Sequence, residues 1–351
     1  MTYIAKPPVR HPALARNALG LTARDYEGAM STLCAGCGHD SVTAAIIQAV
    51  FELSIPPHRV AKLSGIGCSS KTPTYLLGQA HGFNAVHGRM PTIATGASAA
   101  NRELVYLGVS GDGDSLSIGL GHLCHAVRRN VDMLYVIENN GVYGLTKGQF
   151  SASADVGSRS KRGEENRQRP IDPALLALSL GATFVARGFS GDKAQLVPIL
   201  KAGLEHPGFA LVDVISPCVA FNDHEGSTKS YGYTREHARP VVIADFLPGA
   251  TEAAADYGAG ALQPVTFPDG SKVLFRKVPE GYDPTDRAGV ERYLRERVDQ
   301  GEVVTGLLYI EPGAPDMHAG LGTVASALTT LPFEELCPGA AELDRLQAGF
   351  R

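Results

Sequence analysis

The chain has 351 residues, of which 44% are hydrophobic and 19% are charged. This composition provides enough apolar residues for a full core and excludes a largely disordered protein. The formal net charge of −4 argues against a general nucleic-acid-binding role and against a polybasic membrane-binding role. No stretch approaches the roughly 20 apolar residues of a membrane span, and the N-terminus lacks the apolar segment of a secretory signal. We therefore expect a cytoplasmic protein that binds neither nucleic acid nor membrane.

The first predicted elements follow an N-terminal arm, residues 1–30, which is rich in proline and shows no periodicity. Helical apolar spacing begins after Asp40 or Ser41, either of which is a plausible N-cap. A short strand is predicted from Arg59 to Leu63, and it leads into the Gly-rich segment GIGCSSK. A second predicted strand, Glu103 to Val109, leads into the segment GDGD.

The next elements complete a strand–loop–helix–strand unit. A helix is predicted from about Ile118 to Arg129, and a strand from Met133 to Glu138 ends at Asn139-Asn140-Gly141. Such a unit implies two parallel strands joined by a right-handed crossover. The alternation continues with predicted helices and strands over 173–180, 183–186, 192–205 and 209–215. It predicts an α/β fold, a doubly wound and mostly parallel sheet with helices on both faces.

The sequence divides into three parts: the arm (1–30), a ligand-binding domain (31–245) and a C-terminal extension for subunit contacts (246–351). Periodicity weakens in the extension, where we predict one further strand at Leu307 to Ile310. The charged segment 151–170 is expected to be a solvated surface loop, with a flexible lid or docking loop as the alternative. Ligands of doubly wound sheets bind beyond the carboxyl ends of the strands, and the segments GIGCSSK, GDGD, NNG and SPC all follow predicted strands.

Two of these segments together predict a metal–diphosphate site. Asp112 and Asn140 each follow a strand of the same unit, so their side chains can reach one point at the sheet edge. Gly111 and Gly113 allow the backbone to approach a ligand closely, and amides at a helix N-terminus favour an anion. Carboxylate, amide and carbonyl oxygens are hard ligands that suit Mg²⁺ with phosphate oxygens. Either motif alone is also compatible with a simple turn.

The six cysteines form a second group of candidates. Cys34 and Cys37 form a CxxC pair, whereas Cys68 and Cys218 each follow a predicted strand at the same edge as the diphosphate site. This pattern is compatible with an Fe–S cluster, a zinc site or unliganded thiols, and disulfides are a less favoured alternative in a large cytosolic chain. Cys124 falls in an apolar helical run and is expected to be a core residue. The neighbouring His122 and His125 are expected to take part in helix packing. Cys337 lies in the tail and has no partner motif.

The segment GDGD followed by NN resembles the thiamine-diphosphate motif. More broadly, the ordered motifs CxGCGH, GIGCSSK, HGR, TG, GDGD, ENNxxYGLTKGQ and SPC, from about residue 33 to 226, closely resemble the beta subunit of 2-oxoacid:ferredoxin oxidoreductases. The chain departs from the family's usual pattern at Leu33, Ala35 and Ser98 and in the charged loop after Gln149, which bears on substrate detail and not on the class.

The resemblance implies which residues bind each group. One [4Fe–4S] cluster would be held by Cys34, Cys37, Cys68 and Cys218, and Mg²⁺ by Asp112, Asn140 and the carbonyl of Val142. Lys71 would face the substrate carboxylate, and His87 would lie near the cofactor, so both are the candidate catalytic residues. The residues expected around thiamine diphosphate are Ile66, Gly67, Ser69, His87, Gly111, Asp112, Gly113, Asp114, Asn140, Val142, Gly144, Leu145 and Thr146.

The resemblance also implies the reaction and its partners. The expected activity is the reversible, coenzyme A-dependent oxidative decarboxylation of a 2-oxoacid, with electrons passed through the cluster to ferredoxin. We expect 2-oxoglutarate as the substrate, with pyruvate as the alternative. The chain is expected to be inactive without an alpha (or fused alpha-gamma) subunit, in a dimer of heterodimers. The rival hypotheses are a redox-free thiamine-diphosphate decarboxylase or synthase and, more distantly, a structural zinc protein.

Overall fold

The centre of the molecule is a sheet whose middle strands run in parallel. The structure is a computed structural model that describes residues 13–160, 162–247, 263–266, 272–277, 281–337 and 339–350. Within these residues ten strands pair in the order β10-β11-β9-β12-β7-β8-β4-β3-β1-β2. Their bounds are β1 Val60–Ser64, β2 His81–Asn84, β3 Val105–Gly111, β4 Met133–Asn139, β7 Phe184–Phe189, β8 Phe209–Ile215, β9 Ala238–Leu247, β10 Gln263–Thr266, β11 Lys272–Lys277 and β12 Val303–Ile310.

The six strands from β7 to β2 are all parallel to one another. Every residue of β4 and β8 is buried, because parallel strands covered by helices on both faces are hidden from water on each side. This burial explains why their sequences, MLYVIEN and FALVDVI, are nearly continuous apolar runs. The prediction of a doubly wound, mostly parallel sheet is confirmed.

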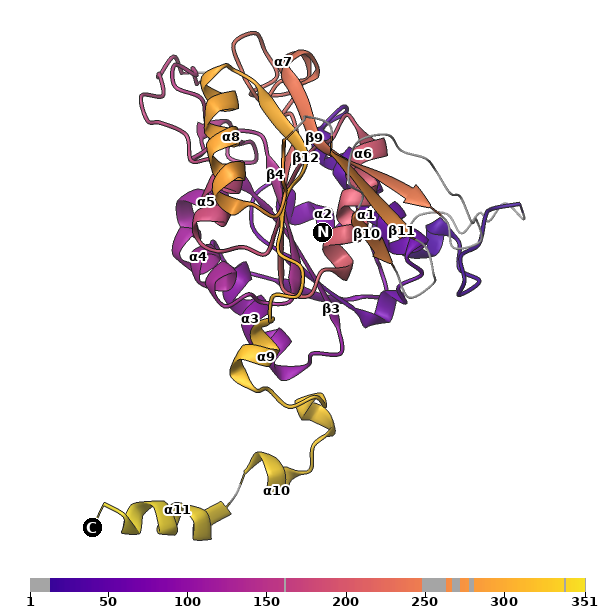
Figure 1. The fold of residues 1–351 in the computed structure, drawn as a ribbon, viewed down its shortest axis with the longest axis vertical. Helices are drawn as coiled ribbons and strands as arrows, with labels where there is room; N and C mark the ends of the chain where they lie inside the picture. The colour runs from indigo at the N-terminus through magenta and orange to yellow at the C-terminus, as the bar shows by residue number, and fades with distance from the viewer. Residues whose placement is uncertain are drawn as a thin grey trace.

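Helices cover both faces of this sheet (Figure 1). α1 packs against α6 on one side, while α3 packs against α4 and α5 packs against α8. The helix bounds are α1 Gly38–Glu52, α2 Thr72–Tyr75, α3 Met90–Ala100, α4 Leu120–Arg128, α5 Pro173–Ser179, α6 Lys193–Glu205, α7 Tyr231–His237, α8 Arg287–Asp299, α9 Met317–Leu321, α10 Phe333–Leu336 and α11 Gly339–Ala348. Shorter elements are the hairpin of β5 Val142–Tyr143 and β6 Gln149–Phe150, the 3₁₀ turns Ala23–Tyr26, Pro57–Arg59, Ser69–Lys71 and Leu328–Thr330, and a π-helical turn at Asp114–Ile118.

The first long helix begins earlier than its sequence predicts. α1 starts at Gly38, with Cys37 as its N-cap residue, and not after Asp40 or Ser41. Cys37 has an extended backbone (φ −61°, ψ 132°) and is the last residue before the helix. The helix therefore follows the CxxC pair directly. This places the second cysteine of the pair at the start of a buried helix, which fixes its position relative to the sheet.

The C-terminal part of the chain joins the same sheet. The expected boundary at 245/246 falls inside β9, and β12 lies between β9 and β7, antiparallel to β7. The sequence prediction missed this because strand order along a sheet is set by long-range pairing, and β12 removes the edge that β7 would otherwise expose. Of the N-terminal arm, residues 1–12 lie outside the described residues, whereas Tyr26 is fully buried against the core.

The chain after α9 leaves the body of the molecule (Figure 1). α10 and α11 contain no buried residues. Several large apolar side chains on this tail are exposed, with Phe333 at 71% and Phe350 at 93%. Within the described part of the chain, no helix has both the length and the apolar character needed to span a bilayer.

Candidate active site

The segments that follow four neighbouring strands meet at one edge of the sheet. β8, β4, β3 and β1 are adjacent and parallel, so their carboxyl ends lie side by side. The segments that follow these strands are SPC after β8, NNG after β4, GDGD at the end of β3 and GIGCSSK after β1. The arrangement predicted from the order of the elements is therefore present, because consecutive parallel strands deliver their following loops to the same edge.

Asp112 is the central buried carboxylate of this edge, with 1% of its surface exposed. Its Oδ2 accepts hydrogen bonds from the amide of Gly141 at 3.0 Å and from Ser153 Oγ at 2.6 Å, and a further one from Ser151 Oγ. Its Oδ1 receives a long contact of 3.5 Å from the amide of Asn140. Burial raises the pKa of Asp112 against the lowering effect of these donors. A cation at Oδ1 would stabilise the charged form.

Asn140 and Val142 lie beside Asp112 on the loop after β4. Asn140 Oδ1 accepts from the amide of Val142 at 3.0 Å, and the carbonyl of Asn140 accepts from Asn222 Nδ2 at 2.8 Å. Gly141 adopts φ +76°, where a Cβ would lie 2.7 Å from Asn222 Nδ2, so this turn requires glycine. The residues therefore present carboxylate, amide and carbonyl oxygens on one short loop and strand end, a donor set that fits Mg²⁺.

Asp114 ties three loops of the site together. Its Oδ1 accepts from the amide of Gly88 at 2.7 Å, and its Oδ2 accepts from Ser110 Oγ at 2.9 Å and from the amide of Ile66 at 3.3 Å. Asp114 is thus a structural bridge between GDGD, the HGR segment and GIGCSSK. Both carboxylate oxygens of Asp114 accept hydrogen bonds from these donors, so Asp114 anchors the three loops.

Close packing surrounds the glycines of the GDGD segment. A Cβ on Gly113 would lie 2.5 Å from the ring of Tyr143, and the Tyr143 hydroxyl donates to the carbonyl of Gly113 at 2.8 Å. On the neighbouring loop Ser69 is buried, with its Oγ 2.9 Å from the position of a Cβ on Gly111. A side chain larger than hydrogen at Gly111 or Gly113 would clash with these neighbours or distort the backbone of the segment.

The four predicted cluster cysteines are gathered next to this loop. A Cβ on Gly144 would lie 3.4 Å from Cys218 Sγ and 3.5 Å from Cys68 Sγ. Burial, with smaller contributions from the nearby Glu138, Cys218 and Cys68, raises the pKa of the Cys37 thiol to about 12. Burial also raises the pKa values of Cys68 and Cys218, and each of these thiols interacts with Cys34. Thiols that are protonated alone become thiolates when a metal displaces the proton.

The other two cysteines lie apart from this group. Cys124 is on α4 and half-buried, where the sequence predicted a core position, and Cys337 is exposed in the tail. His122 contacts Thr92. Among the described residues, no three or more His, Cys, Asp or Glu side chains converge so as to hold one metal ion. A cluster is different, because each of its thiolate ligands binds a different iron ion.

A buried polar group that the sequence prediction missed lies between the cysteines and Asn140. Glu138 is fully buried and accepts from Thr72 Oγ1 at 2.9 and 3.1 Å. His39 bonds to Ser216 Oγ at 2.6 Å, and its Nε2 lies 3.5 Å from Asn140 Nδ2. Burial raises the pKa of Glu138 well above its ordinary value and lowers that of His39 to about 4. His39 is therefore neutral near pH 7, so its 3.7 Å approach to Glu138 is not an ion pair.

Two serines were also missed. Ser151 and Ser153 are buried and bond to Asp112, although the sequence predicted a solvated loop from residue 151. The prediction is wrong for 151–154, where three of four residues are buried, whereas 162–165 and 167–170 are exposed. The available signal was the serine spacing i, i+2 directly after the YGLTKGQ hairpin.

The remaining predicted residues lie nearer the surface. Lys71 is half-buried, with Nζ 3.5 Å from Thr32 Oγ1, and its charge lowers the pKa of Cys68, in which burial is the larger effect. His87 and Leu145 are exposed, and Thr146 Oγ1 donates to Gln149 Oε1 at 2.6 Å. Gly67 adopts φ +84° in the turn before Cys68. The structure therefore brings together the predicted metal ligands (Asp112, Asn140 and Val142) and the predicted cluster cysteines. It leaves His87 and Leu145 exposed to solvent.

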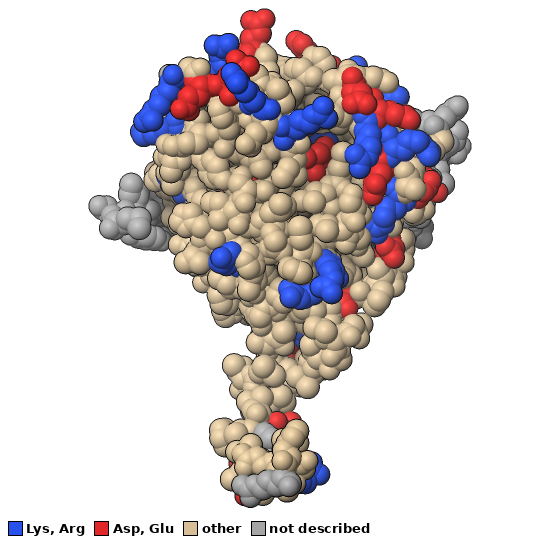
Figure 2. All heavy atoms as spheres, turned by 90° about the vertical axis from the view of Figure 1, so that its left-hand side faces the viewer, with Lys and Arg blue, Asp and Glu red and all other residues tan. Residues whose placement is uncertain are grey.

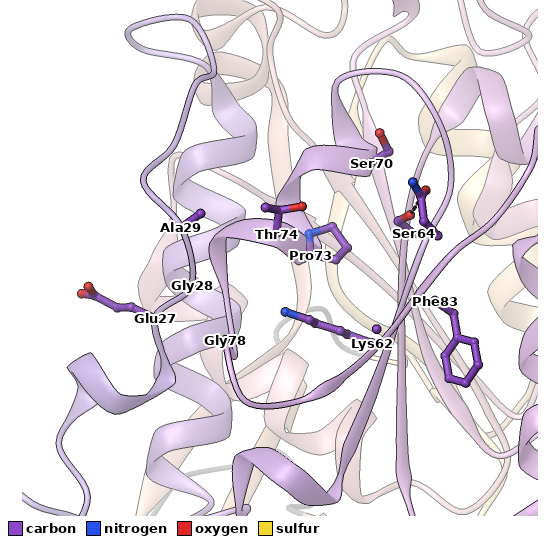
Figure 3. A pocket seen from close by; sticks show the side chains of 12 residues that line it. Glu27, Gly28, Ala29, Lys62, Ser64, Ser70, Pro73, Thr74, Gly78 and Phe83 are labelled. Carbon is purple, nitrogen blue, oxygen red and sulfur yellow. Dashed lines mark hydrogen bonds between the residues drawn. The ribbon is translucent and has the colours of Figure 1, made fainter. Parts of the chain in front are cut away.

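A cavity of about 430 Å³ lies beside this edge, between β1, β2 and α2 (Figure 3). Lys62 lies along it and donates to the carbonyls of Leu76 at 2.7 Å and Leu77 at 2.9 Å. Burial lowers the pKa of Lys62 to about 8. Ser64 Oγ and Asn84 Oδ1, 2.7 Å apart, form another part of its lining. The predicted metal ligands and cysteines are not among its lining residues.

Comparison with known proteins agrees with this site. Residues 65–214 match the family described as "Thiamine pyrophosphate enzyme, C-terminal TPP binding domain". The chain is 44% identical over 199 residues to the 2-oxoacid:ferredoxin oxidoreductase subunit beta of Saccharolobus solfataricus, which covers 56% of this chain and 65% of the relative. With the 2-oxoglutarate oxidoreductase subunit KorB of Mycobacterium tuberculosis, identity is 42%, over 60% of this chain and 58% of the relative. The chain thus spans less than two thirds of the length of these two relatives.

A further relative is matched over more of its length. The 2-oxoglutarate synthase subunit KorB of Methanocaldococcus jannaschii is 35% identical over 61% of this chain and 76% of the relative. Among solved structures, the 2-oxoglutarate:ferredoxin oxidoreductase from Magnetococcus marinus, with 2-oxoglutarate, coenzyme A and succinyl-CoA bound, superposes with a TM-score of 0.71. It is 29% identical, over 90% of this chain and 94% of that chain. With this coverage, the chain belongs to the family of 2-oxoacid:ferredoxin oxidoreductase beta subunits.

Proposed function

We propose that this chain is the beta subunit of an enzyme that oxidatively decarboxylates 2-oxoglutarate to succinyl-CoA and CO₂ with ferredoxin as electron acceptor. The observation that carries this proposal is the meeting of two sets of ligands. Gly144, two residues after the candidate metal ligand Val142, lies against the sulfurs of Cys68 and Cys218. A hard oxygen site and a soft thiol site on one loop would allow electrons to pass between the groups they bind.

Asp112, Asn140 and the carbonyl of Val142 would hold Mg²⁺, and the glycines of GDGD would admit the diphosphate of thiamine diphosphate. When bound, thiamine diphosphate supplies a carbanion nucleophile and an electron sink for decarboxylation. The chain itself fixes the carboxylate of Asp112 through Oδ2. Burial also keeps His39, which lies next to Asn140, neutral near pH 7.

Cys34, Cys37, Cys68 and Cys218 would hold one [4Fe–4S] cluster, which supplies one-electron storage. Overall, the 2-oxoacid anion and coenzyme A thiol give acyl-CoA, CO₂ and a proton, and two electrons reduce two one-electron acceptors. Cys34 is the exposed member and Cys218 the buried member of the four. Electrons would therefore leave toward ferredoxin on the Cys34 side. The reverse, reductive direction uses the same residues.

The substrate assignment is supported by the relatives. Three of those compared are named for 2-oxoglutarate, whereas others carry the broader name 2-oxoacid, which keeps pyruvate as the alternative substrate. A comparison of turnover with 2-oxoglutarate and pyruvate at equal concentration decides between them. Faster turnover of pyruvate would contradict our assignment.

We further propose that the chain works only with an alpha (or fused alpha-gamma) subunit, in a dimer of heterodimers in the cytoplasm. Part of the support is surface chemistry. The face on the side of α4 and α5 is largely uncharged at its centre, whereas charged side chains gather along its upper part (Figure 2). The exposed apolar residues of α10 and α11 add a second surface suited to a protein partner. All six cysteines are unpaired, which fits a reducing compartment.

The partner requirement predicts a clear result in an activity assay. The purified chain, anaerobically supplied with cofactor, Mg²⁺, 2-oxoglutarate, coenzyme A and a viologen dye, is expected to show no turnover. Addition of the alpha subunit should restore it. Visible absorbance that bleaches on reduction would support the cluster. Robust turnover by the chain alone would contradict the partner requirement, and a colourless, zinc-containing protein would contradict the redox function.

Lys71→Ala tests the proposed contact with the substrate. Lysine contributes a point charge to a carboxylate, so loss of this charge is expected to raise KM for the 2-oxoacid about 10-fold or more, corresponding to a hydrogen bond to a charged group of about 1.5–3 kcal/mol. Retention of thiamine diphosphate should be unchanged. The matched control is Lys193→Ala, on α6. Lys147→Ala is not a suitable control, because the exposed Lys147 lies on the loop that is expected to contact the cofactor. An unchanged KM would show that Lys71 does not contact substrate.

A further inference from the structure

A continuous line of buried polar side chains runs from Asp112 through the sheet. Ser153 Oγ lies 2.6 Å from Asp112 Oδ2 and 2.8 Å from Asn139 Oδ1. Asn139 Nδ2 donates to Asp213 Oδ1 at 2.9 Å, and Arg187 Nε donates to Asp213 Oδ2 at 2.7 Å. All five residues are at most 5% exposed. We call Ser153, Asn139, Asp213 and Arg187 the buried line.

The inner end of the buried line is held by charge and by register. Arg187 of β7 and Asp213 of β8 are paired neighbours in the sheet, and Arg187 also forms an ion pair with Asp172 at 2.6 Å. Asp172 in turn accepts from the amides of Ala174 and Leu175 at the start of α5. Burial alone would raise the pKa of Asp172, but the Arg187 guanidinium lowers it overall. This end of the line is therefore anchored to two strands and a helix.

The anchoring fixes the orientation of the Asn139 amide. Because Asp213 Oδ1 receives the Asn139 amide nitrogen, Asn139 presents its oxygen to Ser153. The Ser153 hydroxyl has one proton and two acceptors within reach, Asp112 Oδ2 and Asn139 Oδ1, so it donates to one of them at a time. Ser151 Oγ bonds to the same Oδ2 of Asp112 and lies 3.2 Å from Ser153 Oγ. With the amide of Gly141, these groups surround Oδ2 and leave Oδ1 as the less occupied oxygen.

We propose that Ser151 and Ser153, with the buried line behind Ser153, are positioning residues that make Asp112 a one-oxygen metal ligand through Oδ1. This inference rests on the proposed function, because it assumes that Asp112 binds Mg²⁺. A purely structural role for the same residues would affect folding and leave metal affinity unchanged. Groups behind a ligating carboxylate typically change metal affinity 10- to 100-fold.

The test measures metal affinity directly. The full chain, co-purified with its alpha subunit and stripped of metal, is titrated with Mn²⁺ in the presence of thiamine diphosphate, and free Mn²⁺ is followed by its paramagnetic resonance signal. Ser153→Ala is expected to weaken Mn²⁺ binding about 10- to 100-fold, and Ser153→Thr, which keeps a hydroxyl, should restore most of it. The matched control is Ser230→Ala, because the Ser230 hydroxyl is also buried but bonds to Ser227 and Tyr233; its Mn²⁺ affinity should equal that of the wild type.

The outcomes separate the inference from the proposed function. No Mn²⁺ binding by the wild type with thiamine diphosphate would overturn the proposed function. Normal binding by the wild type and equal binding by Ser153→Ala would overturn the inference alone. If Asn139 acts through Ser153, Asn139→Ala should weaken binding in the wild-type background and have no further effect in the Ser153→Ala background. Additive losses in this cycle would remove Asn139 from the mechanism.

Discussion

Asp112→Ala is expected to abolish the retention of Mg²⁺ and thiamine diphosphate. Asp112 would be the only charged metal ligand that this chain supplies, and Mg²⁺ binds weakly to sites made of neutral oxygens alone. The change would also leave the amide of Gly141 and two serine hydroxyls without their buried acceptor. Metal analysis and a fluorescence assay for thiamine after gel filtration measure both contents.

The matched variant is Asp112→Asn, which keeps the shape of the side chain and one acceptor oxygen and removes the charge. It is expected to fold like the wild type and to lose most of the bound Mg²⁺. Asp316→Ala, at the start of α9, controls for the loss of a carboxylate elsewhere. Wild-type cofactor content in both Asp112 variants would place the metal site elsewhere and refute the ligand assignment.

Cys218→Ser is expected to cause the second large effect, the loss of the iron–sulfur cluster. Cys218 is the most distant of the four cysteines in sequence, but it is the most buried of them and lies beside Cys68 across Gly144. Iron–sulfur clusters bind soft thiolates far better than hard oxygen ligands, and serine offers only an oxygen. Iron, acid-labile sulfide and the spectrum of the reduced protein report cluster content.

Cys124→Ser is the control for this experiment. Cys124 is a half-buried thiol that lies on α4, outside the group of four. We expect its iron content to match the wild type, with a small loss of stability at most. Wild-type iron content in Cys218→Ser, or cluster loss in Cys124→Ser, would show that the four-ligand assignment is wrong.

Parallel strands and their following loops could be predicted from the sequence because the signals are local. Continuous apolar runs such as β8, whose bounds 209–215 match the prediction, reflect burial on both faces. The prediction was less complete where local signals are weak. β2 is an exposed four-residue strand, and α3 is rich in small residues, so neither shows the apolar periodicity on which sequence reasoning depends.

The sequence by itself predicted the class of the site, because the expected ligands are chemical types at fixed places after strands: Asp112 and Asn140 for a hard cation, and four cysteines for a soft centre. These ligand assignments stay predictions. Only the tertiary structure decided how these groups are held. The place of β12 beside β7, the buried His39 and Glu138, and the serines behind Asp112 all depend on contacts between distant segments. Burial and partner geometry, which local sequence does not encode, keep His39 neutral, raise the pKa of Glu138, and determine which oxygen of Asp112 remains available.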